Sequence, residues 1–93
     1  MVSELQRMYG RVRGRVQGVG FRYFVLRQAR QFAVTGFVRN EPDGSVAVEA
    51  QGGAEDVRAF CDALRRGPAL ARVERVEVTP MQPVRDDETF RVL

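Results

Sequence analysis

The residues best suited to chemistry form one glycine-rich run, Gly14-Arg15-Val16-Gln17-Gly18-Val19-Gly20-Phe21-Arg22. Glycine has no Cβ, so it adopts positive φ at little cost and lets a ligand lie directly against the backbone. Successive amide groups of such a loop can form an anion-binding nest, to which the N-terminus of a following helix adds donors. Arg22 would close this cradle with a forked guanidinium suited to phosphate oxygens. The run predicts a phosphate-binding loop, although its spacing alone also fits a plain strand-to-helix turn.

Known nucleotide-binding loops do not match this run. No Gly-Lys-Ser/Thr follows it, and Gly18-x-Gly20 is followed by Tyr23 where a dinucleotide loop needs Gly or Ala. The chain has no histidine, which excludes histidine bases, phosphohistidine intermediates and histidine metal ligands. The single cysteine, Cys61, falls on the apolar stripe of a predicted helix, and we interpret it as a buried apolar side chain. Because the run matches neither nucleotide-binding loop, we expect no nucleotide cofactor.

Length and composition indicate a single domain over residues 1–93 with one two-layer core. All 15 basic residues are arginine and the net charge is +3, which favours an anionic partner without separating nucleic acid from a small substrate. No apolar run approaches the ~18 residues of a membrane span, and no signal peptide is recognisable. We expect a cytoplasmic monomer without a membrane partner.

Hydrophobic periodicity predicts the elements that position the loop. Alternation predicts strands and a 3.6-residue stripe predicts helices. The predicted elements are strand 8–16, helix 21–32, strands 34–40 and 45–51 joined by a turn, helix 55–66, strand 73–79 and a short edge strand at 89–93. This order predicts an α+β, ferredoxin-like split β-α-β sandwich, with two helices on one face of a four- to five-stranded antiparallel sheet.

Asn40 is a second candidate site residue, because it ends the 34–40 strand. A side chain at a strand end can project into a site. A strand-end asparagine also commonly satisfies its own turn, here Pro42-Asp43-Gly44. The spacing leaves both roles open.

Taken together, two segments closely resemble the signatures of the acylphosphatase family. They are the 14–22 run and Gly36-Phe37-Val38-Arg39-Asn40, and the resemblance extends from about residue 7 to residue 92. It implies hydrolysis of the carboxyl–phosphate anhydride of a small-molecule acyl phosphate to carboxylate and inorganic phosphate. It also implies no metal, no cofactor and no phosphoenzyme, with phosphate or sulfate as product or competitor.

The same resemblance implies a role for each site residue. The backbone amides that bind the phosphoryl oxygens belong to Gln17, Gly18, Val19, Gly20 and Phe21. Arg22 would be the essential cationic partner, and Asn40 would hold the attacking water. The chain departs from its relatives at Gln31-Phe32-Ala33-Val34-Thr35, where Leu-Gly-Leu is common, and we expect this change to affect packing rather than chemistry.

The alternative function is an RNA-binding or anion-binding module of the same fold without catalysis. RNA-recognition domains share this layout, and the alternate arginines at 11–15 would give a basic face. Such domains stack bases on aromatic residues of the central strands, whereas here the aromatic cluster at 21–24 falls in a helix. We therefore expect a small-molecule substrate and no nucleic acid.

Overall fold

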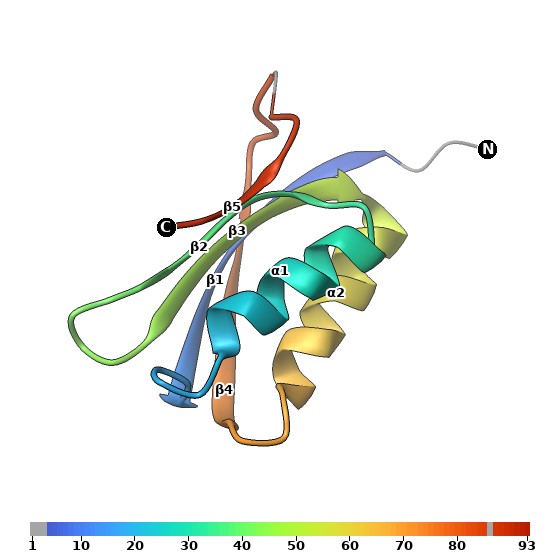
Figure 1. Cartoon of the computed structure of the whole chain (residues 1–93). Coiled ribbons are helices and arrows are strands. Elements are labelled where there is room, and N and C mark those ends of the chain that lie inside the picture. Colours follow the sequence, from blue (N-terminus) through green and yellow to red (C-terminus); the bar gives the residue numbers. More distant parts are fainter. Residues whose placement is uncertain (1–3, 86) are drawn as a thin grey trace.

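The structure, a computed structural model, describes residues 4–85 and 87–93 (Figure 1). Its elements in chain order are β1 (Leu5–Arg15), α1 (Phe21–Gln31), β2 (Thr35–Asn40), β3 (Val46–Gly53), α2 (Ala54–Arg66), β4 (Arg72–Met81) and β5 (Phe90–Val92). The order agrees with the prediction, but the boundaries differ by one to three residues, most clearly at β1, β3 and β4. β1 begins at Leu5 rather than at Met8, because its first residues pair with Gly52 and Gly53 of β3. β4 continues through Pro80, which an edge strand tolerates.

The five strands form one sheet in the order β4-β1-β3-β2-β5. The pairs β4–β1, β1–β3 and β3–β2 are antiparallel, as predicted. The terminal strand is an exception to the predicted antiparallel sheet, because β5 pairs parallel to β2, with Phe90 opposite Gly36. β5 runs in the direction opposite to β4. Because β4 also runs opposite to β2, β5 and β2 run in the same direction. The parallel pairing places the end of β5 beside the end of β2.

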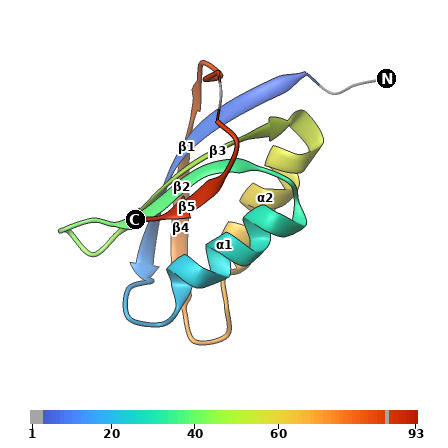
Figure 2. The same ribbon diagram turned by 45° about the horizontal axis from the view of Figure 1, so that its top comes forward.

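Both helices cover the same face of the sheet (Figure 2). α1 buries a stripe made of Phe21, Val25 and Ala29. The buried residues of α2 are Val57, Phe60, Cys61, Ala63 and Leu64. The predicted burial of Cys61 is therefore confirmed. No helix in the described part of the chain is both long and apolar enough to cross a membrane.

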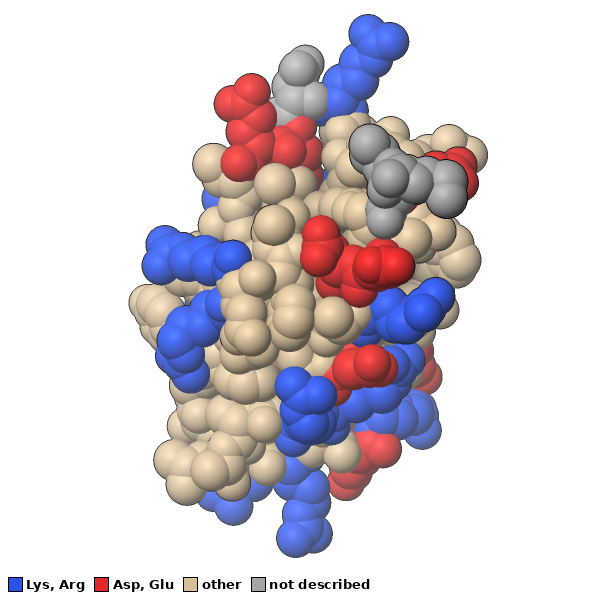
Figure 3. All heavy atoms as spheres, turned by 90° about the vertical axis from the view of Figure 1, so that its right-hand side faces the viewer, with Lys and Arg blue, Asp and Glu red and all other residues tan. Residues whose placement is uncertain are grey.

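The opposite face of the sheet carries arginines that are paired with carboxylates. Arg11 contacts Asp43 and Glu41, and Arg13 contacts Asp43 and Glu77. Arg15, the last residue of β1, is exposed. The face shown in Figure 3 likewise has arginines and carboxylates interspersed. The sheet therefore lacks the continuous free basic surface that the nucleic-acid alternative requires, as far as the described residues show.

Candidate active site

The glycine loop, residues 16–20, connects the end of β1 to the start of α1. Gly18 and Gly20 have φ angles of 73° and 76°, in the left-handed region. A Cβ added at either residue would meet no atom within 4 Å, so glycine is needed here for backbone conformation rather than for space. These two conformations turn the chain sharply into the first turn of α1.

The N-terminus of α1 is open to a ligand. Gly20 is the N-cap residue, no side chain caps the helix, and its first turn contains no acidic residue. The first amide groups of a helix lack partners within the helix, and the helix dipole places positive potential at this end. Because no carboxylate neutralises that potential, the start of α1 is suited to bind an anion.

Gln17 holds the glycine loop against the β2–β3 turn. Its Nε2 donates hydrogen bonds to the backbone oxygens of Glu41, at 2.7 Å, and Ser45, at 2.9 Å. The side chain of Gln17 therefore acts as a brace, and only its backbone is available to a ligand in the loop. The sequence predicted the backbone role and missed the brace, because it depends on a contact with a distant turn.

The β2–β3 turn is itself stabilised by Asp43. Asp43 Oδ1 accepts hydrogen bonds from the hydroxyl of Ser45, at 2.5 Å, and from its amide, at 2.9 Å. These bonds, together with Arg13 and Arg11, lower the pKa of Asp43 to about 2. Asp43 therefore stabilises the turn after β2, which was one of the two roles that the sequence left open for Asn40.

Asn40 instead lines a pocket with the glycine loop. The register places Asn40 opposite Val46, and Val46 opposite Val12 of β1, so β2 ends on the side of the sheet where the glycine loop begins. The pocket has a volume of about 170 Å³ and is lined by Val16, Gly18, Gly20, Phe21, Arg22, Tyr23 and Asn40. This volume is below the ~300–1,000 Å³ of pockets that enclose drug-sized ligands. It suits a group of the size of a phosphate.

The guanidinium of Arg22 is held at the pocket by the end of the chain. Its Nη1 donates a hydrogen bond of 2.8 Å to the backbone oxygen of Leu93. Leu93 is fixed in turn, because its amide donates to the backbone oxygen of Val38 at 2.8 Å. Parallel pairing of β5 with β2 makes this contact possible, since an antiparallel β5 would end at the far side of the sheet.

The predicted site residues therefore fall into two groups. Gly18, Gly20, Arg22 and Asn40 line the pocket, as does Phe21, which is also part of the buried core. The side chains of Gln17 and Val19 point elsewhere, Gln17 to the β2–β3 turn and Val19 against the core. Sequence reasoning missed the parts played by Val16, Tyr23 and Leu93.

Within residues 4–85 and 87–93, no group of three cysteine, aspartate or glutamate side chains is placed to hold a metal ion. The residues that line the pocket carry backbone amides, one guanidinium, one carboxamide and, at Tyr23, one phenolic hydroxyl. The first three kinds of group come from the predicted site residues. All three kinds of group can donate hydrogen bonds to an oxyanion.

Fold and site together define a small α+β domain with a phosphate-sized pocket at a strand-to-helix loop. The chain belongs to the acylphosphatase family, since the family model described as Acylphosphatase matches residues 8–92. This finding confirms the family and the acylphosphatase function predicted from the sequence, and it does not favour the RNA-binding alternative.

Individual relatives match over nearly their whole length. The chain is 48% identical over 87 residues to an acylphosphatase of Salinibacter ruber, covering 94% of this chain and 92% of that protein. It is 49% identical over 88 residues to an acylphosphatase of Moorella thermoacetica, covering 95% and 94%. The crystal structure of acylphosphatase from Bacillus subtilis matches with a TM-score of 0.91 at 33% identity, covering 97% of this chain and 99% of that one. These structural matches also confirm the predicted fold class.

Proposed function

We propose that this enzyme cleaves the carboxyl–phosphate anhydride of acyl phosphates in the pocket between the glycine loop and Asn40. The amides of Gln17 to Phe21 and the guanidinium of Arg22 bind the phosphoryl oxygens. The carboxamide of Asn40 orients the attacking water. The observation that carries this proposal is the convergence of loop, arginine and asparagine, from separate elements, on one phosphate-sized pocket.

The reaction requires the protein mainly to position the substrate and to stabilise the negative charge on its phosphoryl oxygens. A carboxylate is a good leaving group, and phosphoryl transfer passes through a transition state whose charge is spread over the phosphoryl oxygens. Donors that already point at those oxygens stabilise this charge without reorganising during the reaction. The glycine loop and the N-terminus of α1 supply such donors, because their φ angles and the Gln17 brace fix them beforehand.

Arg22 contributes a guanidinium that is oriented before substrate arrives. One of its donors is used by the Leu93 oxygen, and an arginine side chain has five. The remaining donors can therefore bind phosphoryl oxygens while the contact with Leu93 persists. This arrangement lowers the conformational entropy lost on binding, because the side chain is already held in place.

Asn40 positions a water and does not remove its proton. A carboxamide does not accept a proton at neutral pH, so it cannot be a general base. Its oxygen can accept a hydrogen bond from the water and its nitrogen can donate one. The asparagine side chain is exposed and makes no hydrogen bond to the described residues, so it is available for this role. The proton passes to a phosphoryl oxygen of the substrate, and the products are the carboxylate and inorganic phosphate.

The test is hydrolysis of benzoyl phosphate and acetyl phosphate by the purified chain, followed with and without a chelator. We expect turnover that the chelator leaves unchanged and that inorganic phosphate inhibits competitively. Arg22→Ala should lower kcat/KM by at least about 10²–10³-fold, as expected for loss of a preorganised charge donor. Phosphate that protects the chain against heat without any turnover would instead identify a non-catalytic anion-binding module.

Three further expectations from the sequence remain predictions. They are the single-domain organisation over residues 1–93, the monomeric state and the cytoplasmic location. Light scattering of the purified chain tests the monomeric state.

A further inference from the structure

The pocket accommodates only part of an acyl phosphate. Its volume of about 170 Å³ suits a phosphoryl group, and residues of the glycine loop and Arg22 are among those that line it. The acyl half of the substrate must therefore extend beyond the pocket, past its rim. Any preference for one acyl group over another depends on what lies at that rim.

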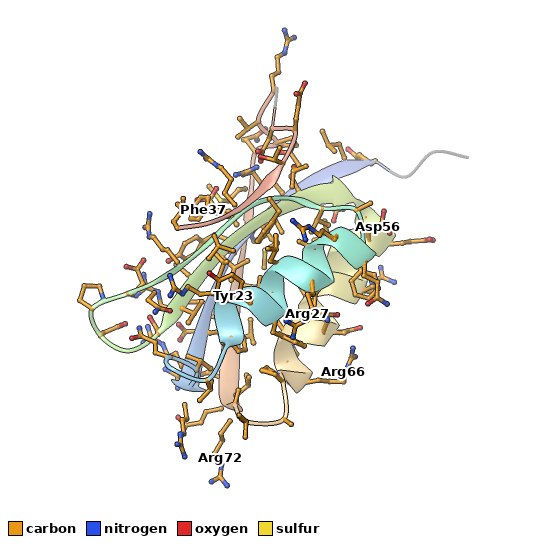
Figure 4. The ribbon with its side chains drawn as sticks, in the orientation of Figure 1. Tyr23, Arg27, Phe37, Asp56, Arg66 and Arg72 are labelled. Carbon is orange, nitrogen blue, oxygen red and sulfur yellow. The ribbon has the colours of Figure 1, made fainter. Side chains whose placement is uncertain are left out.

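Tyr23 is the aromatic side chain at the rim. It is 60% exposed and nevertheless lines the pocket. It lies two positions after Phe21 along α1, which at ~100° per residue places it about 200° around the helix from that buried ring. The core contacts of α1 are made by Phe21, Val25 and Ala29, so Tyr23 points away from the core. Figure 4 shows it at the N-terminal end of α1.

The direction of helical side chains brings the Tyr23 ring toward the glycine loop. In an α-helix each Cα–Cβ bond leans toward the N-terminus, so a residue in the first turn covers what precedes the helix. Here the preceding segment is the glycine loop, residues 16–20. An extended group attached to a phosphate in the pocket would therefore leave it alongside the tyrosine ring.

Contacts within the described part of the chain do not explain why an aromatic side chain stands at position 23. The aromatic pairs of the described residues are Phe21 with Phe24 and Phe60 with Phe90. The hydroxyl of Tyr23 makes no hydrogen bond to the residues that the structure describes, whereas that of the other tyrosine, Tyr9, accepts two from Arg11. A ring left mostly in water beside a binding pocket is free to contact a ligand.

We propose that Tyr23 is a specificity-determining residue that contacts the acyl group and favours acyl phosphates with an aromatic acyl group over acetyl phosphate. This inference rests on the proposed function. The ring of Tyr23 packs against the ring of the substrate, and a methyl group gives it much less to contact. An aromatic pair contributes about 0.5–1.5 kcal/mol, which corresponds to about 2- to 12-fold in rate or affinity.

The experiment measures kcat/KM for benzoyl phosphate and for acetyl phosphate and compares their ratio between variants. Tyr23→Ala should lower the benzoyl-to-acetyl ratio about 3- to 10-fold, mainly through KM for benzoyl phosphate. Tyr23→Phe should keep the wild-type ratio, because the ring and not the hydroxyl makes the contact. Arg27→Ala is the matched control: Arg27 is exposed one turn further along α1 (Figure 4), and its loss should leave the ratio unchanged.

Three outcomes would overturn the inference. The ratio could stay at its wild-type value in Tyr23→Ala, or both substrates could lose rate equally, which would indicate a general effect on the loop. The third outcome is a Tyr23→Phe variant whose benzoyl-to-acetyl ratio falls as far as that of Tyr23→Ala, since that would assign the effect to the hydroxyl. A wild-type chain that hydrolyses neither substrate would refute the proposed function itself, and the inference with it.

Discussion

Gln17 offers a sharp test of how the glycine loop is held. Replacing it by methionine keeps the side-chain length and removes the donor that bonds the oxygens of Glu41, at 2.7 Å, and Ser45, at 2.9 Å. A typical hydrogen bond contributes about 0.5–1.5 kcal/mol net, so losing both should destabilise the fold by about 1–3 kcal/mol. For a domain of this size that corresponds to a melting temperature lower by roughly 5–15 °C.

The functional effect of Gln17→Met should exceed its effect on stability. The loop amides would no longer be fixed relative to Asn40, and a misplacement of about 1 Å can cost on the order of 10²-fold in rate. We therefore expect kcat/KM for an acyl phosphate to fall about 10- to 100-fold while the protein stays folded at 25 °C. Thermal melts by circular dichroism and steady-state kinetics measure the two effects.

Gln31→Met is the matched control for this variant. Gln31 is exposed at the end of α1 and makes no side-chain hydrogen bond to the described residues, so both quantities should stay near their wild-type values. A Gln17→Met enzyme with wild-type kcat/KM would rule out this catalytic effect of Gln17, because the loop would then be positioned without its brace. Unchanged kinetics with a lowered melting temperature would show a brace that serves stability alone.

Three further predictions concern a backbone angle at Ala33, the hydrogen bond between Arg22 and Leu93, and the lowered pKa of Asp43. Ala33 has a φ of 55°, so Ala33→Gly should raise the free energy of unfolding by about 0.5–1 kcal/mol in urea titrations, and a loss of stability would contradict the strain assigned to it. Deleting Leu93 removes the acceptor for Arg22 and should lower kcat about tenfold, less than Arg22→Ala does; an unchanged kcat would show that the guanidinium needs no such support. Because the folded-state pKa of Asp43 is about 2, below its ordinary value of 3.8, its stabilising contribution is present above about pH 4 and is lost as pH falls toward 2. The melting temperatures of wild type and Asp43→Asn should therefore differ at pH 5 and converge near pH 2, whereas a constant difference would contradict the shift.

The parts of the site that depend on local sequence were predictable. Glycines at positions 18 and 20 before a helical stripe indicate a loop with positive φ, and both φ angles have that sign. Alternation in the 34–40 strand also placed Asn40 at a strand end. What could not be predicted was whether this strand end reaches the glycine loop, because that depends on the pairing of β2 and β1 through β3.

Contacts between segments far apart in the chain account for most of what the sequence missed. The Gln17 brace and the Arg22–Leu93 hydrogen bond join residues 24 or more positions apart. No local pattern specifies either, and the Leu93 contact further requires the parallel direction of β5. Ala33 is exposed and has a φ of 55°, a backbone feature that the periodicity of residues 31–35 did not indicate; the expected effect of this segment on packing stays a prediction.

In the proposed mechanism the glycine loop and Arg22 bind the phosphoryl group while Asn40 directs the water, and Asn40→Ala separates these roles. The measurement is kcat together with the inhibition constant of inorganic phosphate, both taken from one competitive inhibition experiment. We expect kcat to fall by about 10²-fold or more, because the water loses its orientation, while the phosphate inhibition constant stays within about threefold of wild type. A variant that keeps its kcat, or that loses phosphate binding in step with turnover, would contradict this division of roles.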